Sequence, residues 1–295
     1  MLLIGKAGHS NDKIMFFKIP KLLSQIKRRK SNNYLRMTFI EANKYFAPDE
    51  SVKYLYHYTT IEALVNGMIV KSPKKGEEIC LWATHNQYMN DPLEFERGIS
   101  ILNKMLDVMK EQYKMDIRII QENTDTYKAN RYFVCFSEHS DCLPMWNMYG
   151  ANGHGVALKL NRFQQTINDE WILKCEYEFE NVRRNFMNFL KEDIQIVIMY
   201  LSLLPFIIKH PAYSYEAETR FISAFPHVPT KYRHRNGMII PYKEILLEKE
   251  LLDAIIIGPS ANQDKLEQSL RSFLDDNNLT HVKIERSSIP YRTKI

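Results

Sequence analysis

The 295-residue sequence lacks the short motifs by which several large enzyme classes are recognised. It contains no GxGxxG after a strand-like run, no GxxxxGK[ST], no HExxH and no GxSxG. These motifs cradle nucleotide phosphates, bind a catalytic zinc ion or expose a nucleophilic serine. Their absence removes support for P-loop phosphoryl transfer, zincin proteolysis and α/β-hydrolase chemistry.

Cysteine, glycine and proline are also scarce. The four cysteines, Cys80, Cys135, Cys142 and Cys175, show no CxxC spacing. This argues against a zinc ribbon and provides no disulfide framework. We therefore expect free thiols in a reducing cytosol, and hence a cytoplasmic protein without a bound metal. Gly 10 and Pro 12 are too few for a fibrous or low-complexity chain.

No apolar run is long enough to predict a membrane span. The longest extends from Ile194 to Ile208, is interrupted by Gln195 and Ser202, and contains Pro205. A transmembrane helix needs about 20 apolar residues, so this segment is predicted to be a buried helix. The few apolar residues before Gly5 are too short for a secretory signal, and we expect none.

The chain does have enough apolar residues for a sizeable core, at 45% hydrophobic and 12% aromatic. Its net charge of +5 does not by itself indicate a nucleic-acid-binding protein. Residues 1–45 form the most basic stretch and are predicted to be an amphipathic helical arm that contacts nucleic acid, anionic lipid or a partner. The alternative is a solvated helix that caps the domain. Its basic residues include Lys18, Lys21, Lys27, Arg28, Arg29, Lys30 and Arg36.

Residues 46–295 are predicted to form a single α+β domain. Strands are predicted at 55–58, 68–71, 79–84, 132–137, 156–160, 171–179, 215–224, 239–240, 252–257 and 282–285. Helices are predicted at 61–66, 93–118, 144–149, 181–208 (one helix or a hairpin) and 263–275. Because regular βαβ alternation is missing, we expect mixed, mostly antiparallel, short-stranded sheets with flanking helices.

Glu216, Glu218 and Arg220 occupy alternate positions of the predicted strand 215–224. Side chains of a strand alternate between its faces, so all three are expected on one face. Two adjacent carboxylates raise each other's pKa unless a cation relieves them, and Arg220 can do so. Such a pair can bind ribose hydroxyls and stabilise a developing positive charge. The alternative is an exposed face with a surface ion pair, although nearby aromatic residues argue against full exposure.

His57 lies between Tyr56 and Tyr58 on another predicted strand. Its imidazole can donate a hydrogen bond to a hydroxyl or amide of a ligand. A single histidine on a strand is more often a core or edge residue whose hydrogen bonds are satisfied within the protein. Only the presence of the other polar segments favours the ligand-binding interpretation.

Further polar or aromatic residues interrupt apolar segments. Asn90 and Glu94 belong to a turn that starts a helix, where capping and the helix dipole also explain them. Ser137 can contact a ligand or simply end a strand. Trp146 and Tyr149 are three residues apart on a predicted helix and share a face. They can stack on a planar ring or fill the core.

Six segments that contain these residues occur in a fixed order. They are YHYTT at 56–60, NDPLE at 90–94, CFSE at 135–138, MWNMY at 145–149, YEAETRF at 215–221 and IIIGPS at 255–260. Together they resemble the bacterial domain-of-unknown-function family 2971. The resemblance covers about residues 54 to 292 and excludes the basic arm.

The same pattern is more distantly similar to the ADP-ribosyltransferase fold, which carries an early His or Arg, a middle Ser or Tyr and a late Glu. The resemblance implies that His57 binds the nicotinamide ribose, that Ser137 or Tyr149 fills the middle position, and that Glu218 is catalytic. Glu216 would complete an ExE pair with Glu218. NAD would be a substrate, and no metal is implied. The residues expected to contact NAD are His57, Tyr58, Thr59, Asn90, Ser137, Trp146, Tyr149 and Arg220, with Tyr58 or Trp146 stacked on the nicotinamide.

Three functions remain open from the sequence. The first is an NAD-consuming ADP-ribosyltransferase-like enzyme, in the setting of a bacterial toxin or phage-defence effector, whose acceptor is a protein or a nucleic acid. The second is a non-catalytic module that binds nucleic acid or a partner through residues 1–45, with an affinity that falls steeply with salt. The third is a partner-binding protein whose aromatic clusters are core.

Overall fold

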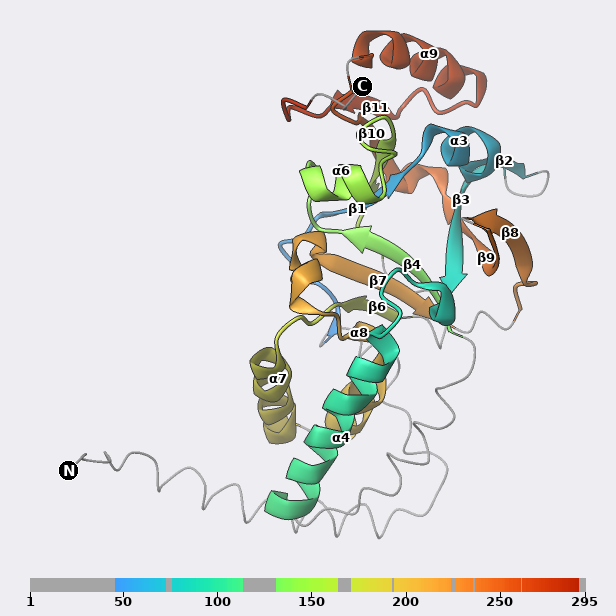
Figure 1. Ribbon diagram of the computed structural model, residues 1–295. Coiled ribbons are helices and arrows are strands. Elements are labelled where there is room, and N and C mark those ends of the chain that lie inside the picture. The colour runs from blue at the N-terminus through green and yellow to red at the C-terminus, as the bar shows by residue number, and fades with distance from the viewer. Residues whose placement is uncertain are drawn as a thin grey trace.

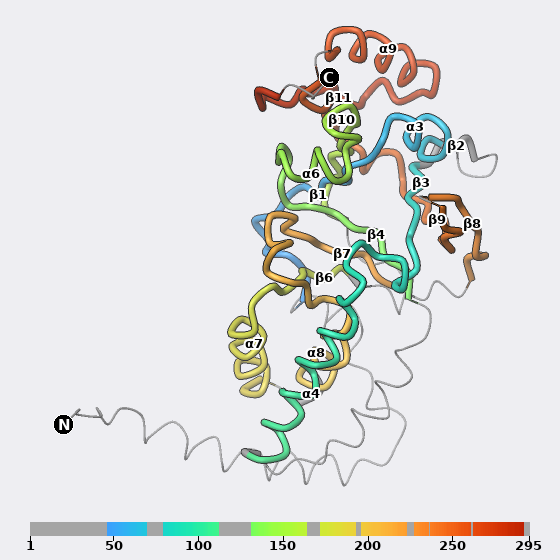
Figure 2. Tube along the Cα trace, in the orientation of Figure 1, coloured from blue at the N-terminus to red at the C-terminus, as the bar shows by residue number. Residues whose placement is uncertain are grey.

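The computed structural model describes residues 46–72, 76–113, 131–163, 171–192, 194–223, 227–235, 237–260 and 262–291 (Figures 1 and 2). The predicted arm at 1–45 and the C-terminal end of the helix predicted at 93–118 lie outside these residues. Among the helices that are described, none is long and apolar enough to cross a membrane.

Eleven strands of the described residues form one hydrogen-bonded sheet. They are β1 (Tyr54–Thr59), β2 (Ile69–Ser72), β3 (Gly76–His85), β4 (Tyr132–Ser137), β5 (Val156–Asn161), β6 (Trp171–Lys174), β7 (Glu218–Ser223), β8 (Lys231–Arg235), β9 (Met238–Glu248), β10 (Leu252–Ile257) and β11 (Lys283–Arg286). The main path is β11-β10-β5-β1-β4-β3-β9-β8, with β2 on β3, β7 on β4 and β6 on β7. Of the pairs between these strands, β10–β11 is parallel and the others are antiparallel.

Helices flank this sheet. The α-helices are α3 (Ile61–Ala63), α4 (Glu94–Tyr113), α6 (Leu143–Met148), α7 (Phe179–Glu192), α8 (Ile194–Ile207) and α9 (Gln263–Asp276). The short helices are η1 (Leu64–Met68), η2 (Asn86–Tyr88), η3 (Pro211–Glu216) and η4 (Lys249–Leu251). In Figure 1, α4, α7 and α8 gather beside β6 and β7, whereas α9 lies at the opposite end with β10 and β11.

Two large apolar cores hold these layers together. One joins α4, α7 and α8 to the sheet, and Phe133 of β4 and Ile222 of β7 contribute to it. The other lies on the opposite side of the same strands and includes Val134 and Phe221. The strands β4 and β7 therefore alternate between two cores, which explains why β4 reads as a nearly continuous apolar run.

The expected mixed α+β architecture with a mostly antiparallel sheet and flanking helices is confirmed. The strand predicted at 132–137 has those bounds as β4, and the apolar run 194–208 forms the buried helix α8. The alternative of two helices within 181–208 is the correct one, because α7 and α8 are separate elements that pack together.

Several predicted boundaries were wrong. The strand predicted at 171–179 ends at Lys174, and Phe179 already begins α7. The strand predicted at 215–224 begins only at Glu218, because η3 occupies the preceding residues. The two-residue strand predicted at 239–240 is part of the much longer β9, and β8 was missed altogether. Strand β8 was missed because basic residues alternate with Tyr and His along it, so that the strand has no apolar face.

Gly67 directly follows the helix predicted at 61–66. The Thr60 hydroxyl caps that helix by accepting a hydrogen bond from Ala63 N at 3.1 Å. The chain instead continues through Gly67 as the π-helical turn η1. A Cβ at this position would lie 2.1 Å from the Trp82 ring, so close packing, and not helix termination, requires glycine here.

Candidate functional site

Five charged residues form a buried group, here called the ionic cluster. They are Glu94, Lys209, Glu216, Glu218 and Arg220, and each is at most 4% exposed. They come from α4, the segment after α8, η3 and β7. Three carboxylates and two cations give the ionised cluster a formal charge of −3 + 2 = −1. Burial of so many charges is costly unless each has partners, so the hydrogen bonds decide whether the arrangement is stable.

The pleat of β7 explains part of this convergence. Glu218 and Arg220 are two residues apart and project from the same face, as the sequence predicted. Glu216 reaches that face by a different route, because it ends η3 and is not in a strand. Between them, Ala217 adopts the left-handed conformation at φ 40° and ψ 52°. That residue redirects the chain from η3 into β7, a conformation that non-glycine residues adopt rarely.

Arg220 is the most enclosed cation of the cluster. Its Nε and Nη2 atoms donate to the two carboxylate oxygens of Glu218, each at 2.9 Å. Its Nη1 donates to Glu94 Oε1 and, at 2.6 Å, to the carbonyl of Phe206 in α8. The guanidinium thus joins α4, α8 and β7 through a planar set of donors that lysine could not reproduce.

Lys209 forms ion pairs with Glu216 and Glu218, the two residues on either side of Ala217 in the sequence. Its ammonium donates to Glu216 Oε2 and, at 2.7 Å, to Glu218 Oε2. The same nitrogen lies 3.9 Å from Glu94 Oε2, an oxygen with no hydrogen-bond partner among the described residues. Lys209 was not among the site residues predicted from the sequence. Its position directly after the apolar run 194–208 is nevertheless a pattern that indicates a buried cation.

The cluster has one end that leads toward the surface. Glu216 Oε1 accepts a hydrogen bond of 2.7 Å from the hydroxyl of Tyr149. The exposed Asn90 donates to that hydroxyl at 2.6 Å and more weakly, at 3.4 Å, to Glu216 itself. Glu216 is therefore hydrogen-bonded directly to a residue that is exposed to solvent, Asn90. The oxygens of Glu218 are instead directed toward Lys209 and Arg220.

These contacts shift the pKa values. Burial raises the pKa of Glu218, but the charges of Arg220 and Lys209 outweigh that effect and hold it well below the usual 4.5. Burial lowers the pKa of Lys209, and the negative charge of Glu218 more than reverses this, so the pKa lies above 10.5. Burial and the charge of Glu216 raise the pKa of Tyr149, which stays a hydrogen-bond donor.

Ser137 contacts the cluster through the backbone. Its hydroxyl donates to the carbonyl of Glu216 at 2.7 Å and accepts from the His139 amide at 3.0 Å. With 0% exposure, its hydroxyl is committed to these two protein groups. Ser137 thus fixes the position of η3 beside β4 and acts on Glu216 indirectly.

Tyr58 and Trp146 pack against each other at a centroid distance of 4.7 Å, in an edge-to-face arrangement. Trp146 is fully buried and donates to Asp141 Oδ1 at 2.7 Å, and Tyr58 donates to the His139 carbonyl at 2.9 Å. Both polar tips therefore have protein partners. These rings fill a small core under α6, so the expectation that one of them stacks on a nicotinamide requires a rearrangement.

His57 does not join the ionic cluster. Residues opposite each other in antiparallel strands share a face, and Tyr56, Ser137 and Glu218 are opposite one another across β1, β4 and β7. The neighbour His57 must point the other way, and its ring lies 6.0 Å from that of Phe136. There Nδ1 donates to the Cys135 carbonyl at 2.9 Å, and burial lowers the pKa.

Thr59 shares the face of His57, two residues further along β1, and is buried. Of the predicted site residues, the structure thus brings together a set on one side of β1, β4 and β7. That set is Asn90, Ser137, Tyr149, Glu216, Glu218 and Arg220, and Tyr58, two residues from Tyr56 on β1, projects to the same side. We call this side the charged face, and we call the side that carries His57, Phe136 and Phe221 the aromatic face.

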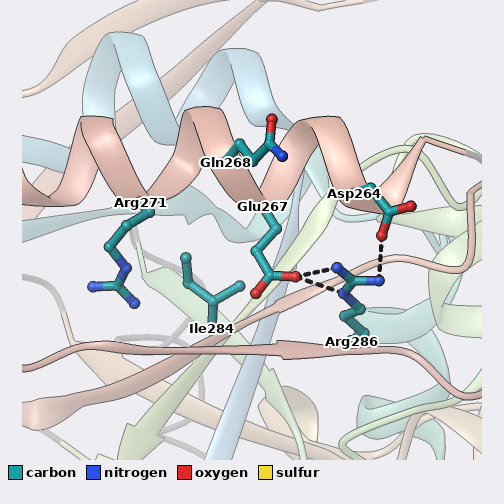
Figure 3. A pocket seen from close by; sticks show the side chains of 6 residues that line it. All are labelled: Asp264, Glu267, Gln268, Arg271, Ile284 and Arg286. Carbon is teal, nitrogen blue, oxygen red and sulfur yellow. Dashed lines mark hydrogen bonds and ion pairs between the residues drawn. The ribbon is translucent and has the colours of Figure 1, made fainter.

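A separate shallow groove of about 740 Å³ lies between α9 and β11 (Figure 3). Arg286 crosses it to bind Glu267 and Asp264, with Nη1 to Asp264 Oδ1 at 2.6 Å. On the other side, Arg271 donates to the Val282 carbonyl at 2.9 Å. Arg286 is paired with two carboxylates of the groove, and Arg271 is held by the Val282 carbonyl and by Asp275, so the groove offers no unbalanced charge for a ligand.

Residues 145–221 match the family model described as "Protein of unknown function (DUF2971)". This confirms the resemblance to domain-of-unknown-function family 2971 over a segment that contains both MWNMY and YEAETRF. The segment runs from α6 to β7 and includes Lys209 and four other members of the charged face. These members are Tyr149, Glu216, Glu218 and Arg220. No curated protein and no solved structure matches the chain.

Proposed function

We propose that the protein consumes NAD by breaking the bond between nicotinamide and ribose, and that it transfers ADP-ribose to a protein or nucleic-acid acceptor. The observation that carries this proposal is the hydrogen-bonded path from solvent through Asn90 and Tyr149 to Glu216. A carboxylate that is held by a hydroxyl and an ammonium is a suitable acceptor for the vicinal hydroxyls of ribose.

The arrangement of strands also supports the proposal. The resemblance to ADP-ribosyltransferases implies an early, a middle and a late polar position. Here the strands that carry these positions, β1, β4 and β7, are hydrogen-bonded neighbours, and Ser137 lies opposite Glu218. The early residue, His57, faces the other side of the sheet, so on β1 it is Tyr56 that is aligned with Ser137 and Glu218.

We assign the ligand-facing carboxylate to Glu216 and a supporting role to Glu218. Both oxygens of Glu218 are occupied by Arg220, and one also binds Lys209. Glu216 instead accepts a 3.4 Å bond from Asn90, long enough for a ribose hydroxyl to replace it. Lys209 holds the other carboxylate oxygen of Glu216 in place while that hydrogen bond forms.

The reaction separates charge at the ribose. The bond between C1′ and the pyridinium nitrogen breaks with its electron pair passing to nitrogen, which releases neutral nicotinamide and leaves an oxocarbenium-like ribose. The negatively charged Glu216, within a cluster of formal charge −1, stabilises this cation. An oxygen or nitrogen of the acceptor, or water, forms the new bond to C1′ and loses a proton to solvent.

The test is nicotinamide release from NAD by the purified full chain, alone and with cell lysate, followed by chromatography. We expect Glu216→Gln to abolish release and Tyr149→Phe to reduce it about tenfold or more, because the phenol positions the carboxylate. Glu267→Gln, a carboxylate of the α9–β11 groove, is the matched control and should retain full activity. No release by the unaltered chain in either condition, together with no rise in its melting temperature on adding NAD, would refute the proposal.

A further inference from the structure

The hairpin of β8 and β9 carries a group of basic and aromatic side chains that takes no part in the ionic cluster. The 17 residues from His227 to Lys243 contain four Lys or Arg, two His and no Asp or Glu. Strand β8 itself reads Lys-Tyr-Arg-His-Arg and is an end strand of the sheet path. Four of its five residues are exposed. We call β8 and the adjoining part of β9, residues 238–243, the basic ribbon.

The pleat distributes the ribbon's side chains between two faces. Lys231, Arg233 and Arg235 project from one face, and Tyr232 and His234 from the other. Arg233 is a structural anchor, because its guanidinium lies over the Trp82 ring at 5.0 Å and donates to Thr84 Oγ1 at 2.8 Å. The cations that remain directed outward are Arg235 and Lys231. Of these, Lys231 forms an ion pair with Glu244 at 2.7 Å.

Exposed apolar groups accompany these charges. Tyr232 is 67% exposed, and Ile239, on the same face of the ribbon, is 70% exposed. Single exposed apolar side chains are common, but exposed apolar groups that gather on one face mark interaction surfaces. A basic strand at a sheet edge with an outward aromatic ring combines the two elements by which proteins hold single-stranded nucleic acid: phosphate contacts and base stacking.

We propose that the basic ribbon binds single-stranded nucleic acid, with Arg235 and Lys231 on phosphates and Tyr232 stacked on a base. Because β8 is an end strand, a polynucleotide that lies along it reaches both faces. Arg235 provides most of the charge complementarity, because residues 227–243 contain no Asp or Glu and Lys231 is already paired with Glu244. The same cations oppose pairing of this edge with the edge of a second copy, which would bring like charges together.

The test is fluorescence anisotropy of labelled oligo-dT and oligo-U, and of a matched duplex, with the full chain over a series of salt concentrations. We expect tighter binding to the single strands. Arg235→Gln should make the fall of log K with log salt less steep by about 0.7, as for one lost phosphate contact. Tyr232→Ser should weaken binding about fivefold or more without changing that slope.

Two controls isolate the ribbon from other basic or aromatic residues. Arg183→Gln removes a comparably exposed guanidinium from α7, and Tyr88→Ser removes a partly exposed ring from η2. Both should bind like the unaltered chain, and unchanged melting temperatures would show that all variants are folded. Affinity and salt slope that stay unchanged in both ribbon variants would overturn the proposal, as would equal losses in the controls.

The oligonucleotide measurement separates this proposal from NAD consumption. It uses no NAD, and Glu216→Gln should bind oligonucleotides as the unaltered chain does. Vesicles with anionic headgroups serve as a second probe. If the ribbon variants lost vesicle binding but kept oligonucleotide binding, the occupant would be a lipid surface and the proposal would be wrong.

Discussion

The charged face and the aromatic face belong to the same three strands, β1, β4 and β7, yet one encloses paired charges and the other encloses aromatic rings. On the charged face, Arg220 and Lys209 are enclosed with three carboxylates. On the aromatic face, Phe136 and Phe221 lie in an apolar core where His57 is a neutral exception. A shift of one residue in register would exchange these environments.

The contrast shows that one face of a sheet can hold a charged cluster beside an apolar core, while the other face holds mainly an apolar core. Each charge on the charged face is balanced by a neighbour, so removal of one member leaves another buried and unpaired. The aromatic face contains few polar groups; among them, His57 donates to the Cys135 carbonyl and Thr219 donates to Glu138. We therefore expect substitutions on the two faces to differ in size and in pH dependence.

The largest effect should follow the loss of the central cation. Arg220→Met keeps most of the side-chain volume but leaves Glu218 and Glu94 without their shared donor. We expect the free energy of unfolding to fall by about 3–5 kcal/mol, measured by urea denaturation at pH 7. A loss below about 1 kcal/mol would mean that the cluster is not held as described.

Glu218→Gln should have the next largest effect, because it removes the negative charge between Lys209 and Arg220. We expect a loss of about 2–3 kcal/mol at pH 7. The folded-state pKa of Glu218 lies below its unfolded value of 4.5, so this contribution is present above pH 4.5 and is lost as the pH falls further. Urea curves of both proteins at pH 7, 5 and 3 should therefore converge toward low pH. A constant difference would contradict this.

His57 should produce a smaller effect, confined to a different pH range. Burial lowers its folded-state pKa below 6.5, so the unfolded chain binds more protons and stability falls as the pH drops below 6.5. The slope is at most about 1.4 kcal/mol per pH unit. His57→Phe should remove this component between pH 7 and 5. The same slope in the variant would show that another group is responsible.

The smallest effect should come from an exposed ion pair beside the same strands. Lys174 donates to Glu138 Oε2 at 2.8 Å, but its side chain is 45% exposed. We expect Lys174→Ala to cost about 0–1 kcal/mol, measured as for Arg220→Met. A loss comparable to that of Arg220→Met would remove the distinction between the buried cluster and a surface pair.

Much of the charged face could be anticipated from local pattern. Alternation placed Glu218 and Arg220 on one face, and the apolar run 132–137 predicted β4 without error. Asn90, Ser137 and Tyr149 were selected because polar groups in apolar segments need partners, and each has one in the fold. The basic ribbon was not anticipated, because its alternation lacks the apolar face that identifies a strand.

The sequence by itself determined the elements and their faces, because backbone geometry alternates side chains along a strand whatever surrounds it. It could not determine that Lys209, after a helix, closes the cluster, or that His57 is turned away from it. Those outcomes depend on the register between β1, β4 and β7 and on the packing of α4 and α8. Only the tertiary structure decides these, since partners such as His57 and Cys135, or Glu94 and Arg220, are 78 and 126 residues apart and leave no periodic trace in one sequence.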